Sequence, residues 1–147
     1  MRRWTLLVSV GLLAPALAAA EALPARAQHA LARGDVRAEE RLAARYDQGR
    51  GMAPDPVVAA RLYRDAARRG SGAAQLNLAQ MYLDGRGVPP DPVEAYAWAD
   101  AAAANGEPDG EHIIDQLAKV MPKAQRERAR SRAARYVELY VSDFSSS

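Results

Sequence analysis

The chain repeats itself with a period of 36 residues. Residues 38–73 and 74–109 are identical at 15 aligned positions, and Tyr46 falls on Tyr82. The motif Gly49-Arg50-Gly51 falls on Gly85-Arg86-Gly87, so the match does not come from alanine content alone. A period of this length predicts stacked supersecondary units that share one continuous core.

Each unit has the pattern of two antiparallel helices. Gly85 is placed to end the first helix in a left-handed conformation. The second helix should begin at Asp91-Pro92, with Asp91 as its cap and Glu94 completing a capping box. Small and apolar residues at helical spacing form the inward stripes of the two helices, which are Ala74, Leu78, Ala79 and Tyr82, then Ala95, Trp98, Ala99, Ala102 and Ala103.

The order Gly-x-Gly, Asp, Ala-x-x-Trp/Leu and Ala-Ala-x-x-Gly over residues 38–106 resembles the Sel1-like repeat family, which is related to tetratricopeptide repeats. The second unit matches almost fully, whereas the first has Leu62 in place of Trp98. The resemblance implies an all-α fold, a short right-handed α-solenoid. We expect one domain over residues 28–144, with repeats at 38–73 and 74–109. A partial repeat and a long C-terminal capping helix should occupy 110–141, before a disordered tail at 145–147.

The N-terminus has the features of a cleaved secretory signal over residues 1–27. Two arginines precede an apolar stretch at 5–17 and a run of small residues. Cleavage could follow Ala20, Ala22 or Ala27, and the sequence favours Ala27 because Pro24 would end the apolar helix just before it. We therefore expect a periplasmic or secreted protein.

The net charge does not indicate a nucleic-acid partner. The sequence pI is about 9.1, but the signal segment takes three arginines and one glutamate from 20 basic and 18 acidic residues. The mature chain is then formally neutral, and no aromatic residues interleave its basic stretch.

The mature chain lacks the side chains that most catalytic centres need. It has no cysteine and only His29 and His112, which excludes a zinc site with several His or Cys ligands and also thiol catalysis. Ser71 has no nucleophile elbow around it, and Asp91, a possible acid–base partner of Asp84, is already assigned as a cap. We predict no enzymatic activity, no metal and no cofactor.

Aromatic residues that could stack on a ligand are better explained as core. Trp98, Tyr46 and Tyr82 occupy positions between helices, whereas Tyr96 is the better candidate for the surface.

Charge is unevenly distributed along the second half of the chain. Residues 84–115 hold eight acidic residues against one arginine, and residues 119–135 hold seven basic residues against one glutamate. The basic helix could be a solvated face, an intramolecular partner of the acidic stretch, or a docking site for an acidic protein or anionic lipid. Its basic residues are Lys119, Lys123, Arg126, Arg128, Arg130, Arg132 and Arg135.

In families of this kind the first helices line a concave groove that binds extended peptides or partner domains. The resemblance therefore implies an exported protein-interaction module, a periplasmic adaptor or regulator; the alternative is a module for the anionic envelope surface or for self-assembly, acting through the basic helix. The repeats specify neither the partner protein nor the oligomeric state. Leu76 should be exposed in the groove. The groove positions carried over by register are Glu40, Ala44, Asp47, Leu76, Gln80, Asp84, His112 and Gln116.

Overall fold

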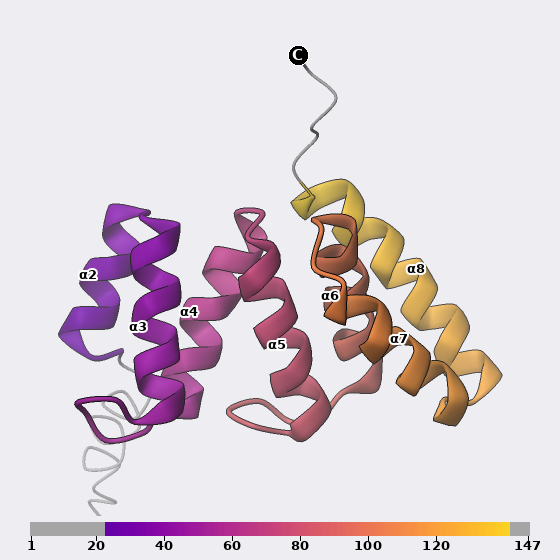
Figure 1. The fold of residues 1–147 in the computed structure, drawn as a ribbon, viewed down its shortest axis with the longest axis horizontal. Helices are drawn as coiled ribbons and strands as arrows, with labels where there is room; N and C mark the ends of the chain where they lie inside the picture. The colour runs from indigo at the N-terminus through magenta and orange to yellow at the C-terminus, as the bar shows by residue number, and fades with distance from the viewer. Residues whose placement is uncertain (1–22, 142–147) are drawn as a thin grey trace, which may run out of the picture.

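The computed structural model describes residues 23–141, which form helices and no strand (Figure 1). This confirms the predicted all-α solenoid. Most of the expected signal segment and the expected disordered tail lie outside the described residues. The helices are α2 (Ala25–Arg33), α3 (Val36–Gln48), α4 (Pro56–Arg68), α5 (Gly72–Asp84), α6 (Pro92–Ala104), α7 (Asp109–Val120) and α8 (Lys123–Tyr140).

The two repeats fold as the helix pairs α3–α4 and α5–α6. Gly49 and Gly85 end the first helices at φ +67° and +66°, a conformation that favours glycine. Asp91 caps α6 by accepting hydrogen bonds from the backbone N–H groups of Val93 and Glu94, at 2.9 and 3.1 Å. Local signals therefore set the helix ends at the places that the sequence indicates.

The predicted capping box at Glu94 is wrong. The backbone N–H of Asp91 donates to the carbonyl of Tyr82 at 3.1 Å, so it does not need the Glu94 carboxylate. The first repeat has the same bond, from Asp55 N–H to the carbonyl of Tyr46 at 2.8 Å. The Glu94 side chain turns instead to α8.

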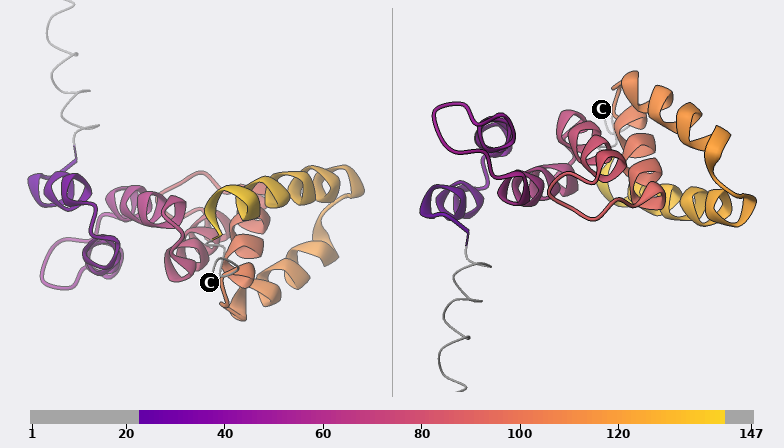
Figure 2. Two further views of the ribbon diagram at one scale, coloured as in Figure 1. Left: turned by 90° about the horizontal axis from the view of Figure 1, so that it is seen from above. Right: turned by 90° about the horizontal axis from the view of Figure 1, so that it is seen from below.

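The helices form two rows. Figure 2 shows α3, α5 and α7 along one side and α2, α4 and α8 along the other, with α6 between α7 and α8. From their connecting loop α7 and α8 diverge, and both pack against α6, which also packs against α5. Because α6 has neighbours on three sides, its sequence is apolar around most of its circumference.

A cluster of three aromatic rings attaches α8 to the second repeat. The ring centroid of Trp98 lies 4.4 Å from that of Tyr136 and 5.4 Å from that of Tyr140. Ala129 and Ala133 are buried along the same contact and allow α8 to approach closely. The predicted core positions of Trp98 and Tyr46 are confirmed.

Tyr96 does not lie on the surface as expected. Its side chain is only 9% exposed, because neighbouring helices cover most of α6. Within residues 23–141, none of the helices has the length and apolar character needed to cross a membrane.

Candidate functional site

The predicted groove residues lie on α3, α5 and α7, the helices of one row (Figure 2). Asp84, His112 and Gln116 are exposed, and Gln80 is half-buried. Gln80 donates to the Asp84 carboxylate at 3.0 Å, and the side chains of Gln116 and His112 are 2.9 Å apart. These four residues present hydrogen-bonding groups on two helices that pack against each other.

Two acidic groove residues make contacts between the repeats. The Glu40 carboxylate accepts a hydrogen bond from the hydroxyl of Ser71, the residue that caps α5. Asp47 Oδ1 lies 3.0 Å from Arg86 Nε, in the loop between α5 and α6. Both carboxylates are therefore engaged within the chain and help to set the orientation of the second repeat.

The expected exposure of Leu76 is wrong. Leu76 is half-buried and packs against the hydrophobic core, since α5 has α4, α6 and α7 as neighbours. Ala44 is also half-buried.

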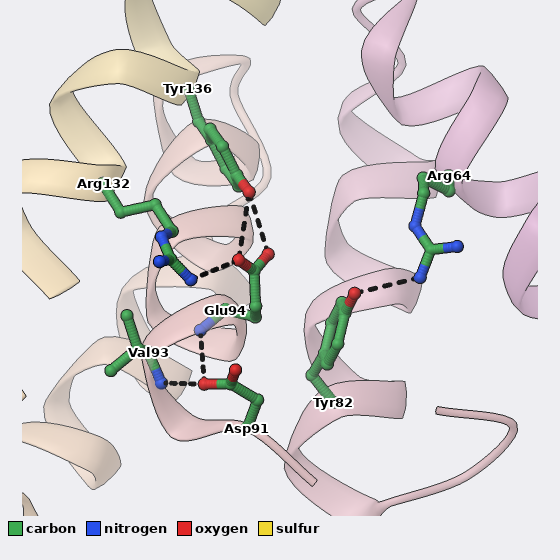
Figure 3. Close-up of polar contacts among 7 residues, drawn as sticks. All are labelled: Arg64, Tyr82, Asp91, Val93, Glu94, Arg132 and Tyr136. Carbon is green, nitrogen blue, oxygen red and sulfur yellow. Dashed lines mark hydrogen bonds and ion pairs between the residues drawn. The ribbon is translucent and has the colours of Figure 1, made fainter. Parts of the chain in front are cut away.

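A hollow of about 340 Å³ opens between α4, α6 and α8, away from the predicted groove residues. Figure 3 shows Glu94 on one wall, where its carboxylate accepts from the Tyr136 hydroxyl at 2.9 and 3.2 Å. Arg132 forms an ion pair with the same carboxylate. On the opposite wall, Arg64 donates to the Tyr82 hydroxyl at 2.9 Å.

The walls of this hollow stabilise the fold. Burial raises the pKa of the Tyr136 hydroxyl, and its hydrogen bond to Glu94 raises that pKa further, so the phenol stays a donor. The sequence allows three roles for the basic helix, one of which is contact with the acidic stretch. The Arg132–Glu94 ion pair is such a contact.

The first repeat contains a buried carboxylate, Glu39, whose side chain is fully inaccessible. Its Oε1 is 3.7 Å from Arg69 Nη1, and Arg69 also lies 2.8 Å from Asp65. The pKa of Glu39 is raised to about 7, mainly by burial and also by the negative charge of Asp65, while the positive charge of Arg69 opposes the shift. Because solvent does not reach the carboxylate, we assign Glu39 a structural role.

The second repeat replaces this charged pair with amides. Gln75 and Asn105 stand 36 residues after Glu39 and Arg69, and Asn105 donates to Gln75 Oε1 at 2.8 Å. Gln75 also donates to the carbonyls of Ala67 and Tyr140, both at 3.0 Å. The end of α8 is therefore held by a polar pair that has a charged counterpart in the first repeat.

The part of the chain from residue 23 to 141 brings together no group of three or more His, Cys, Asp or Glu side chains that could hold a metal ion. A second hollow lies between α2 and α3 and is lined by arginines outside the basic stretch that the sequence indicates at residues 119–135.

The family model that matches the chain is the Sel1 repeat, over residues 36–71 and 72–107. The chain carries two Sel1 repeats. Each matched unit begins at the first residue of a helix, Val36 of α3 or Gly72 of α5, and covers one helix pair.

Solved structures show the same architecture in other Sel1-type proteins. One is c5321, a protective antigen present in uropathogenic Escherichia coli strains and displaying an SLR fold; it is 33% identical with a TM-score of 0.74. Another is a Sel1 repeat protein from Oxalobacter formigenes, 31% identical with a TM-score of 0.57. The matches cover 78% and 70% of this chain, but only 25% and 44% of those chains. None of the curated proteins matches the chain.

Sel1 repeat proteins generally mediate protein–protein interactions, and their solenoid is a typical non-enzymatic scaffold. The fold itself does not determine the partner or its binding surface, which depend on the residues that each chain exposes.

Proposed function

We propose that this Sel1 repeat protein is an exported adaptor or regulator that binds a partner protein on the row formed by α3, α5 and α7. The observation that carries the proposal is the set of polar side chains on two packed helices of that row: Gln80, Asp84, His112 and Gln116. None of the four contributes to the buried core. Their hydrogen bonds to each other leave further donors and acceptors directed to solvent.

A capture experiment tests this surface. The protein is crosslinked in envelope extract of its source cells, and the products are identified by mass spectrometry. The test variant changes all four residues to alanine; the matched control, Arg128→Ala with Arg130→Ala, changes exposed residues of α8 in the other row.

We expect a specific protein that wild type and the α8 control capture but the four-alanine variant does not. Equal capture by all three would contradict the proposed surface. Recovery of lipid or of the protein itself, lost only in the α8 control, would support the alternative in which the basic helix binds an anionic envelope surface or a second copy.

Export is the second part of the proposal. It is supported by the basic start, apolar stretch and small residues of the N-terminus. The fold bears on the cleavage site, because Ala27 is fully buried within α2. Cleavage after Ala20 or Ala22 would leave α2 complete, whereas cleavage after Ala27 would remove its first three residues.

A further inference from the structure

A hollow of about 470 Å³ lies between the first two described helices, α2 and α3. These helices are joined by the short turn at Gly34 and Asp35, so they run antiparallel and side by side (Figure 1). Its apolar lining comes from Ala30, Ala38 and Leu42. The remaining lining residues are Arg26, His29, Arg33, Asp35, Arg41 and Arg45. We call this hollow the α2–α3 cleft.

The α2–α3 cleft has an uncompensated positive charge. Four arginines line it against one aspartate, and all four arginine side chains are exposed. Asp35 already caps α3 by accepting from the N–H of Ala38 at 3.1 Å.

Most of these arginines have no hydrogen-bond acceptor and no acidic partner within the described residues. Arg45 donates from Nε to the carbonyl of Arg50. Between residues 23 and 141, Arg26, Arg33 and Arg41 have neither a hydrogen-bond acceptor nor an acidic partner. This differs from the hollow of Figure 3, where Arg64 has a hydrogen-bond acceptor and the Glu94 carboxylate is paired with Arg132.

The spacing of the arginines identifies the kind of anion that fits. Arg26 and Arg33 are seven residues apart, about 10 Å along α2 at 1.5 Å per residue. Arg41 and Arg45 are spaced by about 6 Å along the facing helix α3. A single phosphate needs donors that converge on one point, whereas donors spread along two helices match a row of carboxylates. Arginine is suited to this role because its planar group binds a carboxylate through two hydrogen bonds.

We propose that the α2–α3 cleft binds an acidic segment of a protein partner. Its carboxylates pair with Arg33, Arg41 and Arg45, with Arg26 extending the row, while its methylene groups cover Leu42. None of the residues proposed to bind a partner on α5 and α7 lines this cleft, so the site is additional to the proposed function and is tested separately.

The test measures binding of a fluorescein-labelled hexaglutamate peptide to the full chain by fluorescence anisotropy. The cleft variant is Arg33→Glu with Arg41→Glu. The matched control, Arg50→Glu with Arg68→Glu, makes the same change in net charge at exposed positions that do not line the cleft. We expect the cleft variant to weaken binding at least about tenfold and the control about twofold or less, because only close pairing depends on position. A hexaglutamine peptide should not bind.

Several results would overturn the proposal. One is equal weakening by both variants, which would indicate attraction to net charge alone. Others are displacement of the peptide by inorganic phosphate at equimolar concentration, or loss of phosphatidylglycerol-vesicle binding in the cleft variant with peptide binding retained. Self-association that disappears in the cleft variant, with no peptide binding by wild type, would assign the cleft to a second copy of the chain.

Two further controls separate the cleft from misfolding and from the proposed function. If Arg33→Glu with Arg41→Glu loses helical circular dichroism, Arg33→Gln with Arg41→Gln replaces it, with the same expected loss of binding. The four-alanine variant of α5 and α7 should bind hexaglutamate like wild type. If it does, the two proposals are tested independently. A failed capture experiment would then not count against acidic-segment binding in the α2–α3 cleft, and a failed hexaglutamate experiment would not count against partner binding on α5 and α7.

Discussion

The Tyr136 hydroxyl donates to both carboxylate oxygens of Glu94, at 2.9 and 3.2 Å. The bond joins α8 to the first turn of α6. It occupies the carboxylate that a capping box would have used, and Arg132 contacts the same group. The basic helix is therefore attached to the second repeat through a defined polar contact as well as through aromatic packing.

Removing this hydrogen bond should lower stability. We expect Tyr136→Phe to reduce the free energy of unfolding by about 1–2 kcal/mol, because a partly buried carboxylate loses a donor. Tyr140→Phe is the control: it belongs to the same ring cluster, and its loss should stay within about 0.5 kcal/mol. Urea unfolding measures both, and equal losses would show that the Tyr136 hydroxyl contributes nothing specific.

The buried carboxylate of Glu39 should make stability depend on pH. Its pKa is about 7 in the folded protein, whereas the pKa of an unperturbed glutamate is 4.5. Folding therefore favours the protonated form, so the contribution is complete below the unfolded pKa and is lost as pH rises through about 7. The shift corresponds to at most about 3 kcal/mol.

Glu39→Gln should remove this dependence, and Gln75 shows that the fold accepts an amide at the equivalent position. Relative to Glu39→Gln, wild type should lose stability between about pH 5 and about pH 8. Denaturant titrations at both values measure the difference. Glu111→Gln changes an exposed glutamate and is the control; its free energy of unfolding should depend on pH as that of wild type does. If the difference in unfolding free energy between wild type and Glu39→Gln is the same at both pH values, Glu39 does not cause the pH dependence.

Gly87 should tolerate substitution less well than its repeat equivalent Gly51. The two have nearly identical φ angles, +71° and +70°. A Cβ at Gly87 would overlap the carbonyl of Pro56 at the start of α4, whereas at Gly51 the nearest atom is an Arg45 side-chain nitrogen 3.4 Å away.

We therefore expect Gly87→Ala to be more destabilising than Gly51→Ala by about 2 kcal/mol, because both share the conformational cost and only Gly87 adds a clash. Thermal unfolding of the two variants measures the difference. Similar midpoints would mean that the loop moves away from α4 without cost.

Maturation of the N-terminus should preserve α2. Since Ala27 is fully buried, we expect the exported form to begin at Glu21 or Leu23. Intact-mass measurement of the protein purified from its source cells identifies the first residue. A mature chain that begins at Gln28 would show that the domain folds without the first turn of α2.

Much of the fold could be predicted from the sequence because the deciding signals are local. Gly85 ends a helix through its own backbone conformation, and Asp91 caps the next helix through N–H groups two and three residues away. The 36-residue period then implies stacking, and the apolar stripes indicate that Trp98 and Tyr46 are buried.

The site was less predictable because exposure depends on which helices become neighbours. Leu76 and Tyr96 are covered because α5 and α6 each pack against several helices, and Glu94 turns to Tyr136, a residue 42 positions away. The α2–α3 cleft had a signal in the arginines at 26, 33, 41 and 45, but only the antiparallel packing of two short helices places them around one hollow. Helix ends are encoded within a few residues of where they act, and the repeat can be read by comparing the sequence with itself. The exposed surface of a solenoid depends instead on long-range packing between helices.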